Sequence, residues 1–410
     1  MLFSDEAIFL KDCFTLRDRN DWKIAKMKIS RQFKKSRLRT RVIKKIEEVS
    51  AEEWNKIFPR VPEGYYFLKT LDESNFDQFS FYYVLVYERK QLIGAAPCFT
   101  VNYSLDTSIN GPLRQFSNAI KIIFPDLFSI KALVCGIPMG QGQMGILAEF
   151  SSVIMGAIEQ RMESLARKIH APIIAFKDFD GSYEKLFTPM LKNGFLKIDS
   201  LPMTRMGLDF SNFEEYLKSL SSSSRYDFRR KLKKASNVKI ESNTVNALDE
   251  KTLNEVYDLY LQAVETHDMG FEIVPRDFFR LISKNMPQET KFFLWRLNGK
   301  LIAFVFCLVS EGVLLDYYLG LDYTPAHEYH LYFVKFKEVM DWCISHGIKT
   351  YEMGATGYEP KRRLKFDFVP VYLYVKVRYK IMRPCIKLLR VLLKFENFDP
   401  ELKRWKKSQK

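Results

Sequence analysis

The amino-acid sequence predicts an α/β protein built from two copies of one strand-and-helix unit. Two observations carry this prediction. Both halves of the chain follow the order helix, hairpin, strand, helix, strand, and a length of 410 residues suggests more than one domain. Hydrophobic residues make up 47% of the chain and charged residues 28%, a composition typical of globular proteins with sizeable cores.

The first unit begins after a basic stretch. Alternating residues over 41–49 indicate a strand, and Ser50 and Glu53 stand in capping-box spacing at the predicted start of a helix. Residues 81–103 form two β-rich runs around a polar turn at 88–91, which indicates a hairpin. The pattern then predicts a strand and a glycine-rich loop over 131–146, a helix over 146–169, a strand over 171–179, a helix over 183–194 and a strand over 195–198.

The second unit repeats this order. Helices are predicted over 251–268 and 275–286, and a hairpin over 290–309 turns at Asn298-Gly299. The pattern then predicts a strand over 313–323, a helix over 327–347 that Gly347 closes, and a strand over 349–355. We therefore divide the chain into a basic arm (1–41), a first unit (42–210), a second unit (211–380) with a basic connecting helix (221–235), and a basic amphipathic tail (381–410).

The charge favours anionic partners. Lys and Arg outnumber Asp and Glu by 64 to 49, which gives a net charge of +15 and a pI near 9.3. Residues 23–45 contain eleven Lys or Arg and no acid, as expected either for a solvated arm or for contact with an anionic surface. The tail pattern fits an interfacial helix, and docking onto the body of the protein is the alternative.

Cysteine usage and hydropathy indicate the compartment. The six cysteines are widely spaced without a C-x-x-C pair, which favours core thiols in a reducing compartment over a zinc site or a disulfide scaffold. The N-terminus lacks a basic leader followed by a long apolar run, and the most apolar run, 301–309, is too short to span a bilayer. We expect a cytoplasmic protein, with peripheral contact at the inner face of the membrane as a further expectation.

The sequence matches cofactor-binding motifs only poorly. The loop "GQGQMG" (140–145) has G-x-G-x-x-G spacing, but Pro138 and Met139 precede it and the nearest acid, Asp178, lies beyond the usual distance. A tight turn or an anion-cradling loop is therefore favoured over dinucleotide binding. His327 and His330 stand at i, i+3 without a recognisable third ligand, so no metal is expected. We expect no permanently bound cofactor.

Basic residues gather at two places that could bind phosphate. Six cations lie between Arg225 and Lys234, and Arg225 and Arg229 share one face of the predicted helix. Lys361 to Lys365 follow the last predicted strand and a glycine-containing turn (354–360), where open α/β sheets bind ligands. Arg offers bidentate contacts to phosphate and Lys a compact charge, so a phosphate-bearing substrate is expected.

These segments resemble a known family. The runs 213–235, 292–309 and 317–366, with the first-unit segments 84–99 and 132–147, resemble the Fem-type branch of the GNAT acyltransferase superfamily, including BioF-like acetyltransferase-domain proteins. The resemblance covers roughly residues 42–380. It implies tandem GNAT-like units, each a mixed, mostly antiparallel sheet flanked by helices.

The resemblance also implies an activity, the transfer of an acyl or aminoacyl group to an amine. The donor would be acyl-CoA, acyl carrier protein or aminoacyl-tRNA, and the acceptor an envelope precursor or an amino lipid. The alternative is a non-catalytic basic protein that binds RNA or an anionic membrane, and DNA is not an expected partner. The usual GNAT pyrophosphate loop is replaced after residue 323 by "TPAHEYH", so the identity of the donor stays open.

Candidate residues follow from the resemblance and from chemistry. The family's Y-x-x-K element matches Tyr358 and Lys361. Lys361 would stabilise the oxyanion or bind phosphate, Tyr358 would position it, and Arg225 and Arg229 would anchor phosphate. Tyr317 and His330 are further candidates for substrate binding.

The reaction also needs a base. Aminolysis requires a neutral amine and a place for negative charge on the carbonyl oxygen, where one fixed donor is worth about 3 kcal/mol. Asp316 and Glu352 lie on the predicted strands nearest this centre, and either could accept the amine proton. Exposed strand carboxylates without a catalytic role are the alternative reading of both residues.

Overall fold

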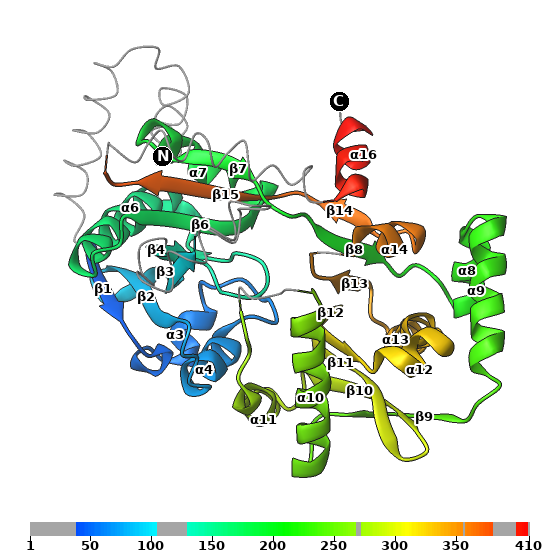
Figure 1. Cartoon of the computed structure of the whole chain (residues 1–410). Coiled ribbons are helices and arrows are strands. Elements are labelled where there is room, and N and C mark those ends of the chain that lie inside the picture. The colour runs from blue at the N-terminus through cyan, green and yellow to red at the C-terminus, as the bar shows by residue number, and fades with distance from the viewer. Residues whose placement is uncertain (1–37, 105–128, 268–271, 356, 380–398, 409–410) are drawn as a thin grey trace, which may run out of the picture.

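The computed structural model describes residues 38–104, 129–267, 272–355, 357–379 and 399–408. Two mixed sheets lie side by side, each with helices on both faces (Figure 1). The predicted class, an α/β protein with two units of mixed sheet flanked by helices, is confirmed.

The first sheet contains eight strands. Its path runs β1-β2-β3-β4-β6-β15-β7, and β5 pairs with β3 off this path. All neighbours are antiparallel except β4 and β6. The strands are β1 (Leu38–Ile43), β2 (Ser80–Glu88), β3 (Gln91–Ser104), β4 (Ser129–Cys135), β5 (Gly145–Ile146), β6 (Ile173–Asp180), β7 (Leu196–Asp199) and β15 (Val371–Val377).

The second sheet contains seven strands in the order β14-β8-β13-β12-β11-β10-β9. Here β12 and β13 form the parallel pair. The strands are β8 (Met203–Gly207), β9 (Ile240–Val245), β10 (Thr290–Leu297), β11 (Lys300–Ser310), β12 (Val313–Leu321), β13 (Thr350–Met353) and β14 (Asp367–Val369). The β10–β11 turn falls at Asn298-Gly299 as predicted, with φ of +51° and +80°.

The two sheets exchange strands. β8 comes before residue 210, yet it pairs with β13 and β14 of the second sheet. β15 comes near the end of the second unit, yet it lies between β6 and β7 of the first sheet. Sheet membership therefore does not follow the expected boundary at 210/211, because each sheet takes one strand from beyond it.

Helices form close to their predicted positions. Ser50 begins α3, and its hydroxyl accepts a 3.1 Å bond from the backbone N–H of Glu53. The predicted helix over 327–347 is interrupted at His330, whose φ of +54° separates α12 from α13. The helices are α3 (Ala51–Asn55), α4 (Tyr65–Glu73), α6 (Ser151–Lys168), α7 (Glu184–Lys192), α8 (Phe213–Ser219), α9 (Ser222–Ala235), α10 (Glu250–His267), α11 (Arg276–Asn285), α12 (Tyr323–Glu328), α13 (Leu331–Ser345), α14 (Tyr358–Arg363) and α16 (Pro400–Ser408), with short 3₁₀ turns η1 (Ile46–Glu48), η3 (Ala148–Phe150) and η4 (Gly181–Tyr183).

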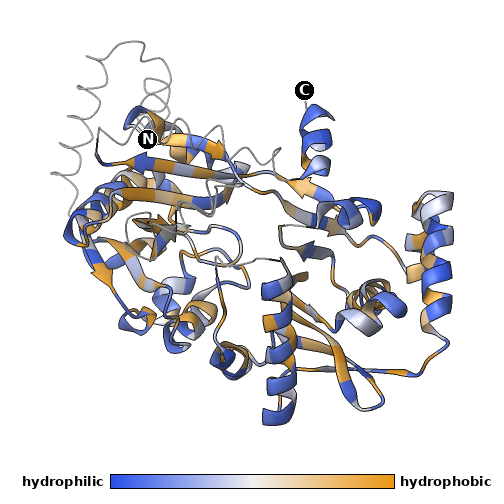
Figure 2. Ribbon diagram, in the orientation of Figure 1, coloured by the Kyte–Doolittle hydropathy of each residue, from blue (hydrophilic) through white to orange (hydrophobic). Residues whose placement is uncertain are grey.

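The two units share one hydrophobic core. Alternate residues of β10 divide between two clusters, Phe292 and Leu294 facing the shared core and Phe293 and Trp295 facing α13. The shared core also takes in α3 and α4 of the first unit and α10 and α11 of the second. Hydrophobic stretches accordingly run along the strands of both sheets (Figure 2).

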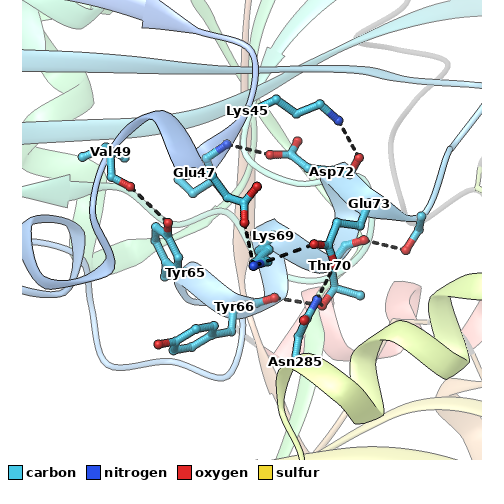
Figure 3. A network of polar contacts seen from close by, with 12 residues as sticks. Lys45, Glu47, Val49, Tyr65, Tyr66, Lys69, Thr70, Asp72, Glu73 and Asn285 are labelled. Carbon is cyan, nitrogen blue, oxygen red and sulfur yellow. Dashed lines mark hydrogen bonds and ion pairs between the residues drawn. The ribbon is translucent and has the colours of Figure 1, made fainter.

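Polar contacts cross the same boundary (Figure 3). The side-chain amide of Asn285 on α11 donates to Thr70 Oγ1 at 3.1 Å and to Glu73 Oε2 at 2.8 Å, both on α4. Within the first unit, the Lys69 ammonium on α4 pairs with Glu47 at 2.6 Å. Because both apolar and polar contacts join α4 to α11, these helices bind the units together.

Several sequence predictions fall partly outside the described residues, including most of the basic arm and of the tail. Four cysteines are described, and all are buried free thiols: Cys98, Cys135, Cys307 and Cys343. Within the described part of the chain, no helix has the length and hydrophobicity that crossing a membrane requires.

Candidate functional site

The candidate site lies where β12 and β13 separate. The two strands pair from Val313 with Thr350 to Asp316 with Met353. β12 continues to Leu321, whereas β13 ends at Met353 and leads through Gly354 towards α14. Beyond Asp316, β12 therefore has no partner strand on this side, which leaves a strand edge next to the residues that follow β13.

Lys361 on α14 points back at this separation. Its side chain is buried, with 7% of the residue exposed. The ammonium donates to the Gly354 carbonyl at 2.6 Å and to the Ala355 carbonyl at 3.4 Å. Burial lowers the pKa of Lys361 to about 7, an effect that Asp316 opposes and Lys335 reinforces. Lys361 can therefore gain or lose a proton near neutral pH.

Asp316 belongs to a buried ion pair. Lys335 on α13 is 0% exposed and donates to Asp316 Oδ2 at 2.6 Å. The Tyr351 hydroxyl donates to the same oxygen at 2.9 Å. We did not predict Lys335 from the sequence. Its burial could have been predicted from its spacing, because Leu331, Lys335 and Val339 recur every four residues along the buried side of α13.

Glu352 faces the other side of β13 from Tyr351, as strand alternation requires. Its carboxylate forms an ion pair with Arg205 on β8 at 2.6 Å. Asp316 and Glu352, the two predicted bases, are thus on opposite faces of the sheet, and each already has a cationic partner.

Tyr317 joins the two units. Its hydroxyl donates at 2.9 Å to Glu63 Oε1, a first-unit residue just before α4. Glu63 is 6% exposed, and burial raises its pKa to about 7, with a further increase from the charge of Glu352. We did not predict Glu63, since a single acid in the turn "PEGYY" carries no pattern.

The glycine-rich loop packs against this pair. Gly140 has a φ of +86°, and a Cβ atom there would lie 2.8 Å from the Tyr317 hydroxyl and 2.9 Å from Glu63 Oε1. At Gly142 a Cβ atom would lie 2.2 Å from the Lys177 carbonyl oxygen. These glycines permit close packing of the first unit's loop against β6 and β12. This packing accounts for glycine at positions 140 and 142 without a bound nucleotide.

Arg225 and Arg229 both lie on α9, whereas Lys361 lies on α14 (Figure 1 labels both helices). Arg225 donates to the Lys218 carbonyl at 3.2 Å. Arg229 forms an exposed ion pair with Glu214 at 2.7 Å. Neither arginine is paired with another predicted site residue.

His330 lies between α12 and α13. It precedes the first residue of α13, and α9 packs on the same helix through Phe228 and Phe333, whose ring centres are 5.0 Å apart. Burial lowers the pKa of His330, and the charges of Lys234 and Lys231 lower it further. Positive charge from α9 therefore acts at the start of α13, and it comes from Lys234, Lys231 and Arg230 rather than from Arg225 and Arg229.

Tyr358 is buried, and its hydroxyl donates to the Pro202 carbonyl at 3.0 Å. Its ring packs on Phe368 of β14. These contacts anchor the start of α14, and so hold Lys361 in place through the backbone.

Metal-binding clusters and surface hollows were compared with the position of this centre. Across the described ranges, no group of three or more His, Cys, Asp or Glu side chains could hold a metal. Hollows of about 400 and 250 Å³ flank β9, and both include Asn243 in their lining. Lys361 and Tyr317 line neither hollow.

Residues 184–379 match the family model FemAB_like, described as peptidoglycan biosynthesis/recognition. The resemblance to the Fem-type branch is confirmed. The matched region runs from α7 to β15, so it contains the whole second sheet and Lys361. Glu63 and the glycine-rich loop lie before the Fem-like region. This match supports a transferase of the acyl or aminoacyl type.

One solved structure supports the fold. The crystal structure of FemX superposes with a TM-score of 0.54 at 11% identity, covering 83% of this chain and 98% of that one. A tandem GNAT protein from the clavulanic acid biosynthesis pathway gives a TM-score of 0.47 at 9% identity, covering 83% and 98%. At such identities the likeness concerns the fold.

A curated relative also matches. It is a Mycobacterium tuberculosis protein that carries the name 8-amino-7-oxononanoate synthase 2, and it is 23% identical over 317 residues. The match covers 73% of this chain but only 40% of the relative. The chain thus spans less than half the length of that relative.

Proposed function

We propose that this protein transfers an acyl or aminoacyl group from a carrier-linked donor to the amine of an envelope precursor or an amino lipid. The observation that carries the proposal is the buried Lys361 ammonium, held on the Gly354 carbonyl where β12 and β13 separate. The Fem-like region contains this arrangement in full.

Lys361 is suited to stabilise charge on the reacting carbonyl. Attack by an amine places negative charge on the carbonyl oxygen, and a fixed cationic donor lowers the energy of that intermediate. The ammonium is buried, so its effect is not screened by water. Its pKa of about 7 means that a substantial fraction carries the proton at neutral pH.

The basic surface of α9 and His330 is suited to the donor carrier. Acyl-CoA, acyl carrier protein and aminoacyl-tRNA all contain phosphate. α9 has six cations and one acid, and its Lys231 and Lys234 act on His330 at the start of α13. From His330 to Lys335 is five residues, or about 7.5 Å along a helix. A phosphate held there would leave the acyl end within reach of the buried charges.

A non-catalytic role in binding RNA or an anionic membrane is the second candidate, and the charge of α9 favours it. Such binding would weaken steeply with added salt. It would not depend on Lys361, because that ammonium is buried and bonded to carbonyl oxygens.

Mass spectrometry of lipids and wall precursors, from cells with and without the protein, tests the proposal. We expect an acylated amine to disappear with the protein and to return with the wild-type chain. Return of the same product with Lys361→Met at the wild-type level would contradict the assigned role of Lys361. Finding no product difference at all, together with tight salt-dependent binding to RNA or anionic vesicles, would favour the second candidate.

A further inference from the structure

Three segments distant in the sequence meet at the Tyr317 hydroxyl. Glu63 accepts its hydrogen bond, and Gly140 approaches so closely that no side chain would fit. Tyr317 is the first residue of β12 beyond the strand's pairing with β13. Glu63 of the first unit thus bonds to the first unpaired residue of β12, and Lys361 of the second unit bonds to Gly354, the residue that follows β13.

We propose that Glu63 is the base that takes the proton from the acceptor amine, with Tyr317 holding its carboxylate in position. This inference rests on the proposed acyl transfer and names a catalytic residue for it.

The two carboxylates predicted as bases, Asp316 and Glu352, already have cationic partners. Asp316 accepts from Lys335 and Tyr351, so protonating it would leave a buried ammonium without a partner. Glu352 is held by Arg205. Within the described residues, Glu63 has no cationic partner, and its bonds come from the Tyr317 hydroxyl and its own backbone N–H. It can accept a proton without breaking an ion pair.

The chemical step balances. The amine gives one N–H proton to the Glu63 carboxylate, and its nitrogen forms a bond to the donor carbonyl carbon. The carbonyl electron pair moves to oxygen beside Lys361. On collapse, the bond from carbon to the carrier sulfur or oxygen breaks, and the carrier leaves with a proton that Glu63 can return.

The charge surroundings set the pH at which Glu63 can act. Tyr317 and Glu352 act on Glu63 from β12 and β13. The charge of Glu272 acts on Tyr317, and the charges of Lys177 and Asp178 act on Glu272. Burial and Glu352 raise the pKa of Glu63 to about 7, and the Tyr317 hydrogen bond opposes this rise. A base is most effective when its pKa is near the working pH.

The test uses purified full-length protein, an extract of cells that lack it as the source of substrates, and mass spectrometry of the product between pH 5.5 and 9. We expect a bell-shaped profile, with Glu63 setting the acid side and Lys361 the alkaline side. Glu63→Gln should lower the rate on the order of 100-fold and remove the acid-side dependence. Asp72→Asn is the matched control, because Asp72 is another buried first-unit carboxyl with a raised pKa, and it should leave the profile unchanged.

Tyr317→Phe gives a second readout that a merely structural role would not move. Losing the hydrogen bond should raise the pKa of Glu63, so the acid-side midpoint should move to higher pH. If Glu63→Gln does not fold, Tyr317→Phe and Glu63→Asp still decide the matter, and an unmoved midpoint in both overturns the proposal. Full activity in Glu63→Gln while Lys361→Met is inactive overturns the role of Glu63 alone. Full activity in both variants overturns the proposed function as well.

Discussion

The Tyr317 hydroxyl donates a 2.9 Å hydrogen bond to Glu63, and so links residues that are 254 positions apart and come from different units. Tyr317 follows Asp316, whose carboxylate faces the opposite side of β12 and pairs with Lys335. One strand therefore presents a polar centre on each of its two faces. The activity and the stability of variants at these centres are expected to change as follows.

Lys361→Met should lower product formation at least about tenfold while the fold is retained. The substitution replaces a buried ammonium with an apolar side chain of similar length, so the core is not opened. Arg363→Met is the control, because Arg363 lies two residues later on α14 and is largely exposed. Mass spectrometry gives the rate and circular dichroism the folded state. Equal losses in both variants would remove Lys361 from the mechanism.

Breaking the buried ion pair should destabilise the protein. Asp316→Asn leaves the Lys335 ammonium buried without a counter-charge, at a cost of about 3–5 kcal/mol in the free energy of unfolding. The double variant Asp316→Asn with Lys335→Met should regain part of that loss, since no lone charge remains. Urea unfolding of the two single variants and the double variant measures the coupling. Additive losses would show that the pair does not act as a unit.

Glu63 should make stability fall as the pH rises. Its pKa is about 7 in the folded protein, against an ordinary value of 4.5, so between these values the folded state holds one more proton than the unfolded chain. The free energy of unfolding should then drop by about 3 kcal/mol across this window. Comparing wild type with Glu63→Gln by urea unfolding from pH 4.5 to 7.5 isolates this contribution, and parallel curves would contradict it.

Lys361 should have the opposite effect at higher pH. Its folded pKa of about 7 lies below the ordinary value of 10.5, so in this range the unfolded chain holds the extra proton. The free energy of unfolding should rise by about 5 kcal/mol between pH 7 and 10.5, and Lys361→Met should lose this rise. Unfolding midpoints at pH 7, 8.5 and 10 suffice, and an equal rise in both proteins would count against a buried, neutralised lysine.

Gly140→Ala should disturb the junction of the two units. Its φ of +86° disfavours alanine, and the new methyl group would meet both the Tyr317 hydroxyl and the Glu63 carboxylate. We expect a loss of about 1–3 kcal/mol of stability together with lower activity. Gly181→Ala is the control, because nothing lies within 4 Å of its Cβ position. Equal melting temperatures for the two variants would show that the loop tolerates displacement.

Much of the fold could be predicted because its signals are local. Ser50 begins a helix and Asn298-Gly299 turns a hairpin through interactions within a few residues. The partners of β8 and β15 could not be predicted in this way. Both read as strands, but which sheet a strand joins depends on packing between segments far apart in the sequence.

The site residues also differ in whether a local sequence pattern indicates them. Lys361 could be proposed from the sequence, because it follows a strand and a glycine turn and matches a family pattern. Lys335 could have been found from its four-residue spacing along an apolar helix face. Glu63 could not, since what distinguishes it is its burial beside Tyr317 and Gly140, and neither neighbour is near it in the chain.

The exchanged strand β15 also bears on how the chain is made. Between β6 and β7 the first sheet has a place that only residues 371–377 fill, and Tyr374 packs there on Phe187 with ring centres 4.2 Å apart. During synthesis this place must stay open until residues 371–377 have left the ribosome. A premature stop before residue 371 would therefore damage the amino-terminal half as well as the end at which it falls.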